Sequence, residues 1–181
     1  MKDTKQDIIA KQFQKHFEHF GYKKTSVDDV AKALNMSKKT IYQYFNSKEK
    51  VFYYIVSGVA QMLSKKMEKQ LEKFSTNKEK LNQFITIIFK ETKRWIKKGN
   101  DAFEFKYKYD IAELAFQEAY DQLLRKIIED GMKQKEFEKQ SLDVIISHIH
   151  GIISESMKLL HTNPSLNIEK DVERSIMKLI L

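Results

Sequence analysis

Residues that form tight turns are scarce in this sequence. Proline occurs once in 181 residues, at Pro164, and glycine occurs only five times. Because sheets need frequent tight turns, which glycine and proline mostly supply, this scarcity favours long helices joined by few loops. Hydrophobic residues make up 41 % and charged residues 32 %, the balance of a folded, soluble protein. We therefore predict an all-α fold.

The net charge of +8 is concentrated near the N-terminus. Residues 1–50 contain eleven lysines against six acidic residues, a net charge of +5 in little more than a quarter of the chain. Such an excess favours a polyanionic partner without identifying it. The absence of cysteine excludes disulfides, thiolate metal sites and thiol nucleophiles. The charged N-terminus and the lack of an apolar run of about 20 residues predict a cytoplasmic protein without a signal peptide or membrane partner.

The first fifty residues are predicted to contain three helices before a fourth begins. Residues 6–20 place isoleucine and phenylalanine at spacings of three and four, as an amphipathic helix does, and Gly21 follows as a C-cap. Ser26 and Ser37 are good N-caps for two short helices, and Asn35 tolerates the left-handed backbone of a tight turn between them. Two short helices joined in this way, braced by longer ones, form a helix-turn-helix.

Several short motifs within this stretch occur in a characteristic order and spacing. They are GY at Gly21–Tyr22, TSVDDVA at 25–31, MSKKTIYQYF at 36–45 and SKEKVF at 47–52, all within 8–52. Together they resemble the N-terminal signature of TetR-family transcription regulators. Asn35 and Lys39 depart from the family, which often has glycine at both positions. The resemblance implies a helix-turn-helix DNA-binding domain over 1–47 and a helical ligand-binding and dimerisation domain over 48–181.

The resemblance also implies that the second helix of the motif enters the major groove of DNA. The outward residue types suit this role: lysine binds phosphate or guanine, glutamine pairs with adenine, and tyrosine reaches phosphate or a thymine methyl. Taken singly, such lysines are usually solvated surface and the serines are caps first. Taken jointly, the predicted DNA-contacting residues are Ser37, Lys38, Lys39, Tyr42, Gln43, Tyr44 and Lys48, with Thr25 or Ser26 as a further backbone contact.

Lys48 adds an argument that does not depend on the resemblance. It lies in the first turn of its predicted helix, where the helix dipole disfavours a cation by about 0.3–1 kcal/mol. A phosphate beside the ammonium would offset that penalty. We therefore expect Lys48 to contact the DNA backbone.

Long helices are predicted for the rest of the chain. They cover 48–74, 78–98, 141–161 and 168–181, together with a region over 101–135 that a break near Tyr109–Asp110 would divide. Within 103–110 the sequence FEFKYKYD alternates aromatic and charged residues, which is the period of a strand inside a helical context. We expect a short helix or an irregular connector there.

Aromatic residues are unusually dense between Phe84 and Tyr120. The resemblance implies a small-molecule pocket in the C-terminal domain, and an aromatic, irregular segment could line or gate a cavity for an apolar or amphipathic ligand. Ordinary helix packing is the alternative for each aromatic residue taken alone. The predicted pocket residues are Phe89, Trp95, Phe103, Phe105, Tyr107, Tyr109, Phe116 and Tyr120.

The last two helices are the predicted dimer interface. Apolar residues recur along 142–160 with Gly151 and Ser154 among them, and the chain ends on the apolar IMKLIL. Leaving such surface exposed is unusual, so we predict a bundle of two helices from each subunit, with packing inside one subunit as the alternative. The predicted interface residues are Ile145, Ile149, Ile152, Ile153, Met157, Leu160, Val172, Ile176 and Leu179.

Neither a cofactor nor a metal ion is expected. His16 and His19 have no evident third ligand, and His148 and His150 are two residues apart, so they point to different faces of a helix. An enzyme on a helical bundle is a weaker alternative, because no nucleophile elbow, phosphate loop, zinc-protease motif or Glu-x-x-His pair occurs.

A nonspecific basic binder of nucleic acid or membrane surfaces is a further alternative, which sequence specificity would distinguish. We predict instead a homodimeric repressor, not an enzyme, that binds a palindromic operator in double-stranded DNA. A small-molecule effector would release it by changing the spacing of the two recognition helices.

Overall fold

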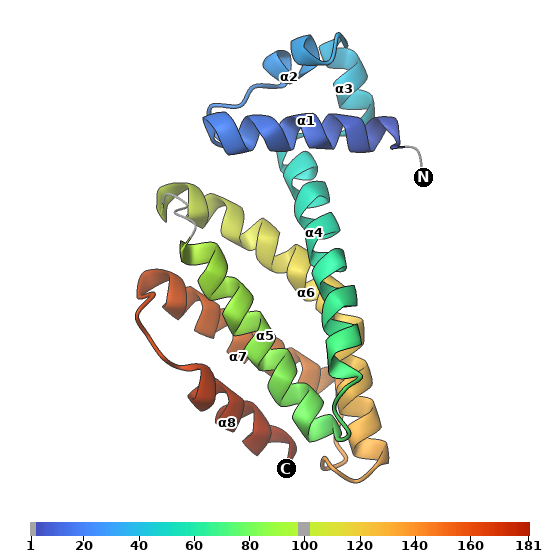
Figure 1. The fold of residues 1–181 in the computed structure, drawn as a ribbon, viewed down its shortest axis with the longest axis vertical. Helices are drawn as coiled ribbons and strands as arrows, with labels where there is room; N and C mark the ends of the chain where they lie inside the picture. The colour runs from blue at the N-terminus through green and yellow to red at the C-terminus, as the bar shows by residue number, and fades with distance from the viewer. Residues whose placement is uncertain (1–2, 98–101) are drawn as a thin grey trace. The chain divides into compact units, whose positions relative to one another are not determined.

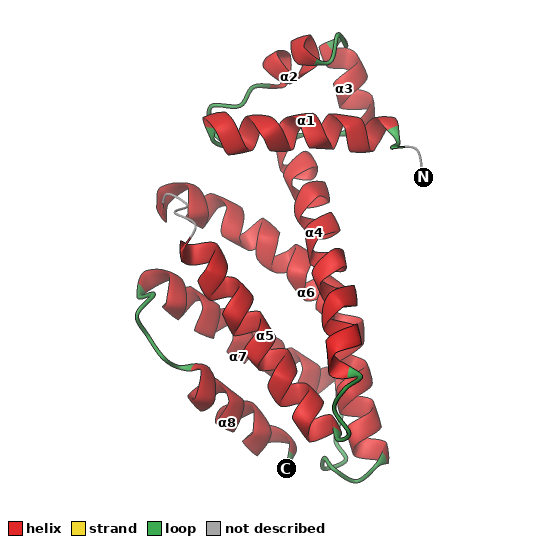
Figure 2. Ribbon diagram, in the orientation of Figure 1, coloured by secondary structure: helices red, strands yellow, loops and turns green. Residues whose placement is uncertain are grey.

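The computed structural model describes residues 3–97 and 102–181, and the side chains of Trp95, Lys97 and residues 102–108 lie outside the described set. All secondary structure in the described residues is α-helical, which confirms the all-α prediction (Figures 1 and 2). In chain order the helices are α1 (Lys5–Phe20), α2 (Val27–Ala33), α3 (Lys38–Tyr44), α4 (Lys48–Leu71), α5 (Asn77–Lys97), α6 (Ala102–Lys133), α7 (Leu142–Thr162) and α8 (Glu169–Ile180).

Side-chain and backbone caps define both ends of α1. A capping box starts the helix: the Asp7 N–H donates to Thr4 Oγ1 (3.1 Å), and the Thr4 N–H donates to Asp7 Oδ2 (2.9 Å). The sequence analysis did not anticipate this box. Gly21 ends the helix as predicted, with φ of 82° and its N–H donating to the Phe17 carbonyl (3.0 Å). Both the start and the end of α1 are therefore set by local hydrogen bonds.

The turn between α2 and α3 has the conformation expected of Asn35. Its φ is 51°, in the left-handed region, and the Met36 N–H donates to the Ala31 carbonyl (2.9 Å). Ser37 then caps α3 by accepting a hydrogen bond from the Thr40 N–H (3.0 Å). The turn and the cap together fix the direction in which α3 leaves α2.

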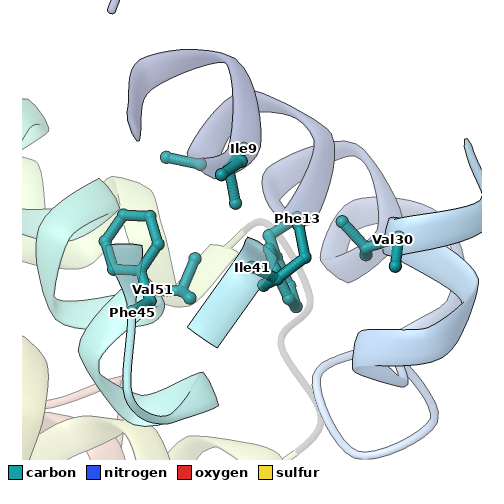
Figure 3. Close-up of a cluster of buried hydrophobic side chains, with 8 residues drawn as sticks. Ile9, Phe13, Val30, Ile41, Phe45 and Val51 are labelled. Carbon is teal, nitrogen blue, oxygen red and sulfur yellow. The ribbon is translucent and has the colours of Figure 1, made fainter. Parts of the chain in front are cut away.

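One apolar cluster joins α1, α2, α3 and the start of α4. Ile9, Phe13, Val30, Ile41 and Val51 are at most 1 % exposed, and Figure 3 shows these side chains converging from the four helices. Each contributes about 1.5–3 kcal/mol through burial. This cluster gives the short helices α2 and α3 a stability that their own length does not provide.

A second core lies in the C-terminal part of the chain, where α5, α7 and α8 pack against one another. Its fully buried side chains include Leu81 and Ile85 of α5, Ile149 of α7 and Ile176 of α8. The described chain thus forms two compact units, one of Met1–Ala60 with Asp101–Phe116 and the other of Gln61–Asn100 with Gln117–Leu181. No helix in the described ranges is both long and apolar enough to span a bilayer.

The carboxylate of Glu136, in the loop after α6, caps the start of α5. It accepts hydrogen bonds from the Asn77 N–H (3.1 Å), the Asn77 side-chain amide (2.9 Å) and the Lys78 N–H (3.0 Å). Burial alone would raise the pKa of Glu136, but these hydrogen bonds stabilise the charged form and hold the pKa below its usual value. The same loop places the Phe137 ring against Gly131, where any side chain would collide with it.

The break predicted near Tyr109–Asp110 is wrong, because α6 runs from Ala102 to Lys133 without interruption. The prediction of an irregular connector over 103–110 fails with it. FEFKYKYD contains no glycine or proline, and its lysine and glutamate are good helix formers. The alternation of aromatic and charged residues over eight positions therefore does not outweigh the helical preference of the residues on either side.

Candidate nucleic-acid interface

The outward face of α3 carries the polar residues expected of a recognition helix. Ile41 and Phe45 are 1 % and 4 % exposed and point into the N-terminal core. The opposite face is solvent-exposed, and the predicted residues on it are Ser37, Lys38, Lys39, Tyr42, Gln43 and Tyr44. Hydrophobic spacing was sufficient to sort these inward and outward positions from the sequence.

The two lysines of α3 differ in their surroundings. Lys38 Nζ forms an ion pair with Asp28 Oδ2 of α2 (3.0 Å), and this hydrogen bond raises the pKa of Lys38. Both side chains are about half exposed, so the pair adds little stability. Lys39 makes no ion pair among the described residues. Lys39 therefore presents its charge to solvent, whereas a DNA contact by Lys38 would compete with Asp28.

Lys48 has partners within the protein that the sequence did not reveal. Its ammonium donates to the carbonyls of Tyr22 (2.8 Å), Thr25 (3.2 Å) and Lys23 (3.5 Å), and lies 4.5 Å from the centroid of the Tyr22 ring. These carbonyls belong to the loop between α1 and α2. The loop thus supplies the negative partner for a cation in the first turn of α4, so the position of Lys48 is no longer by itself an argument for a phosphate.

Thr25 does not lie where a DNA-contacting side chain would. It is 3 % exposed, and its hydroxyl donates to the Gly21 carbonyl (2.8 Å), closing the loop. The prediction that the Thr25 side chain contacts DNA is therefore corrected. Ser26 is half-buried at the start of α2, where its hydroxyl accepts from the Asp29 N–H (3.1 Å). Of the two, only Ser26 keeps surface for a DNA contact.

A groove of about 440 Å³ opens beside α3 and was not anticipated from the sequence. Its lining comes from the start of α1, the end of α3 with the following loop, and the first turns of α4: Gln6, Tyr42, Gln43, Tyr44, Phe45, Asn46, Lys50, Tyr53 and Tyr54. Lys50 could have been noticed, since it too is a lysine in the first turn of a helix. The aromatic residues of VFYYI (51–55) were evident in the sequence, but the sequence did not show that Gln6 of α1 lies beside them.

Asp7 and Tyr54 tie α1 to α4 at this groove. The Tyr54 hydroxyl donates to Asp7 Oδ1 (2.7 Å), while Thr4 donates to Asp7 Oδ2 through its N–H (2.9 Å) and its hydroxyl (2.7 Å). Hydrogen bonds from Thr4 and then from Tyr54 lower the pKa of Asp7 to about 2. The bond to Asp7 also raises the pKa of Tyr54. Both oxygens of the Asp7 carboxylate therefore already accept hydrogen bonds, and these bonds favour its charged form.

The predicted pocket residues are dispersed. Phe89 and Tyr120 are buried in the C-terminal core, at 0 % and 7 % exposure, and Tyr120 stacks edge-on against Phe84 with ring centroids 5.9 Å apart. Tyr109 and Phe116 are partly buried. The remaining predictions fall on side chains outside the described set, namely Trp95, Phe103, Phe105 and Tyr107. A ligand pocket built from these residues stays a prediction.

Most of the predicted dimer interface is core of a single subunit instead. The corrected residues are at most 7 % exposed within one chain: Ile145, Ile149, Met157, Leu160, Val172 and Ile176. A side chain without exposed area has none left to bury against a partner, so packing inside one subunit is the right interpretation for these six. Ile152 and Ile153 are partly buried, and Leu179 is 38 % exposed.

A different face of α7 is exposed and partly apolar. Val144 and Leu159 are 51 % and 53 % exposed. His148 and Gly151 lie between them on the same side, four and seven residues after Val144, and Leu159 follows eight residues after Gly151. A Cβ placed on Gly151 would meet nothing within 4 Å. This face was not predicted from the sequence because the buried residues of α7 make the stronger periodic pattern.

Helices α2 and α3 are short, a tight turn joins them, and α3 presents lysine, tyrosine and glutamine to solvent. This arrangement defines a helix-turn-helix DNA-binding domain. Comparison with known proteins agrees. The family model for bacterial regulatory proteins of the tetR family matches residues 15–55. The uncharacterized HTH-type transcriptional regulator YhgD of Bacillus subtilis (strain 168) is 30 % identical to this chain over 142 residues, which cover 74 % of this chain and 72 % of YhgD. The chain belongs to the TetR family of transcription regulators.

Solved structures show the same fold over nearly the whole chain. RolR without ligand has a TM-score of 0.73 at 11 % identity, with 95 % of this chain and 88 % of that chain covered. The fatty acid degradation regulator FadR of Bacillus halodurans has a TM-score of 0.67 at 20 % identity, with 98 % and 96 % covered. FadR of Thermus thermophilus, in complex with lauroyl-CoA, has a TM-score of 0.71 at 16 % identity, with 97 % and 92 % covered.

Proposed function

We propose that this regulator is a homodimeric repressor that binds a palindromic operator through α3 and leaves it when a small apolar or amphipathic ligand binds the C-terminal domain. The observation that carries the proposal is the exposed face of α3, fixed by the Ser37 cap at its start and by the buried Ile41 and Phe45 on its other side. In this proposal residues 1–47 bind DNA, and residues 48–181 bind ligand and dimerise.

Each residue of that face has a chemically suited role. Gln43 can pair bidentately with adenine, and Lys39 can bind the acceptors of guanine or a phosphate. The exposed rings of Tyr42 and Tyr44 can contact thymine methyls, with their hydroxyls on phosphates. Ser37 would place its hydroxyl near the backbone. In these contacts Gln43, Lys39 and the tyrosine rings would read bases, whereas the tyrosine and serine hydroxyls would position the duplex.

A palindrome requires two copies of α3 related by a twofold axis. The exposed face of α7, with Val144, Gly151 and Leu159, supports a second copy as the occupant, because large apolar side chains at half exposure flank a glycine that allows close helix approach. Leu179 of α8 can extend the same interface. The interface we propose is thus a bundle of α7 and α8 from two subunits, formed by a different face of α7 from the one the sequence predicted.

Two observations support an apolar or amphipathic ligand. Neighbours of the same fold were solved with resorcinol, in RolR, and with lauroyl-CoA, in FadR of Thermus thermophilus. The aromatic residues of α5 and α6 suit an apolar or amphipathic molecule of this kind. Release follows if the bound state favours a spacing of the two α3 helices that no longer matches successive major grooves, about 34–36 Å apart.

Selection from a random duplex library tests the proposal. The full-length protein should enrich a palindrome and bind it by orders of magnitude more tightly than random duplex at the same salt concentration. Binding that enriches no sequence and depends only on salt would contradict it in favour of a nonspecific basic binder. A ligand that binds the protein but leaves operator affinity unchanged would contradict the release mechanism alone.

A further inference from the structure

The groove beside α3 is a preformed feature of the N-terminal unit. The Tyr54 hydroxyl bonds to Asp7 of α1 at 2.7 Å, and the Tyr54 ring packs edge-on against Phe45 with centroids 5.3 Å apart. Helix α1, the end of α3 with the following loop, and α4 are thereby held around one concavity of about 440 Å³. Because its walls are tied together by a hydrogen bond and a ring contact, the groove has no large ordering cost to meet when it is occupied.

Its lining has the chemistry of an anion site. Among the described residues of the lining, Lys50 is the one charged residue and none is a carboxylate; the polar ones are amides and phenols. Lys50 is exposed, and its ammonium lies 5.9 Å from the centroid of the Tyr53 ring on the groove wall. The nearby carboxylate of Asp7 keeps its negative charge, and both of its oxygens already accept hydrogen bonds, from Thr4 and Tyr54. Amide N–H, phenolic O–H and ammonium groups are the donors that phosphate oxygens accept.

The groove is continuous with the face of α3 proposed to read DNA. Tyr42, Gln43 and Tyr44 belong both to that face and to the lining. A duplex whose bases meet Gln43 would therefore carry its own backbone past Lys50. Lys48, two residues earlier, binds the carbonyls of the α1–α2 loop, whereas the Lys50 ammonium lies at the groove. The two lysines at the start of α4 thus differ in their surroundings.

We infer that this groove seats one phosphate of the operator backbone in each half-site, with Lys50 as its cation and Gln6 as an additional donor. The inference rests on the proposed function, since the phosphate belongs to the operator that α3 reads. It adds to the recognition helix a second contact, made by α1 and α4, which fixes the register of the duplex without reading its sequence.

The test is a methylphosphonate scan of the selected operator, in which one phosphate at a time loses its charge, with wild type and Lys50→Ala compared. Wild type should lose roughly tenfold in affinity at one position in each half-site, and Lys50→Ala should lose only a small part of that at the same position, through the contact that Gln6 keeps. The salt slope of the variant should be shallower by about 0.9 for each half-site. Lys50→Arg should restore both.

Lys15→Ala is the matched control, because Lys15 is exposed on α1, nine residues beyond Gln6 or about 13 Å along the helix. It should keep the wild-type scan. Circular dichroism establishes that each variant is folded. A scan of Lys50→Ala identical to wild type, or an equal change in Lys15→Ala, would overturn the inference while the selected palindrome kept the proposed function intact. Failure of wild type to select any sequence would overturn the proposed function itself.

Discussion

Replacing Lys48 with methionine should destabilise the N-terminal unit by about 2 kcal/mol. The ammonium makes two well-formed bonds, to the carbonyls of Tyr22 (2.8 Å) and Thr25 (3.2 Å). Lys48 is half-buried and water can replace it, so each bond contributes about 1 kcal/mol, below the usual range for charged hydrogen bonds. Loss of the contact with the Tyr22 ring adds about 0.5 kcal/mol. Relief of the unfavourable helix dipole offsets about the same amount.

Urea denaturation followed by circular dichroism measures the total, and amide hydrogen exchange at Thr25, whose N–H donates to the Gly21 carbonyl (3.2 Å), locates it in the loop. Lys15→Met, an exposed lysine on α1, is the control and should change stability by less than about 0.5 kcal/mol. A Lys48→Met midpoint equal to wild type, with unchanged exchange at Thr25, would refute the reasoning. The salt slope of operator binding is a separate readout: a slope kept by Lys48→Met means that Lys48 supports DNA binding through the loop alone.

Three further outcomes are expected. Gln43→Ala should relax preference at one base pair of each half-site by about 1–3 kcal/mol without altering the salt slope, as selection with the variant measures; a uniform loss across sequences would exclude base readout. Leu159→Glu should convert dimer to monomer in analytical ultracentrifugation with helicity retained, and an unchanged dimer would place the interface elsewhere. Asp7 has its pKa lowered from 3.8 to about 2 by Thr4 and Tyr54, so it stabilises the fold above about pH 4 and loses that contribution as pH falls towards 2. Asp7→Asn should flatten this acid limb of stability, and an unchanged limb would exclude Asp7 as its cause.

The N-terminal unit was predictable because its structure is determined locally. Gly21, Asn35 and Ser37 each act on their own backbone or on a residue within four positions, so the sequence around them contains the whole interaction. The inward and outward faces of α3 followed from hydrophobic spacing in the same way. Local interactions and hydrophobic spacing were therefore sufficient to predict which residues of the recognition helix are exposed.

Long-range partners were not predictable from one sequence. The carbonyls that hold Lys48 lie more than twenty positions earlier in the chain, and the groove beside α3 needs Gln6 from α1 next to Lys50 of α4. Six of the nine predicted interface residues are buried within one subunit for a related reason. Apolar periodicity identifies a buried face of α7, but it does not distinguish burial in the core of one subunit from burial in an interface between two subunits. The exposure of Val144 and Leu159 becomes apparent only when the structure shows which apolar residues form the core.

The shortness of α3 has a consequence for the rate of binding. A seven-residue helix is marginal in isolation, yet here Ser37 caps its start and Ile41 and Phe45 anchor its inner side. The helix is thus complete before any DNA arrives, and no folding step delays productive encounters. Association should therefore proceed at a rate set by diffusion and by the positive charge of the first fifty residues. Operator variants should differ mainly in how long the protein stays bound, and only slightly in how fast it arrives.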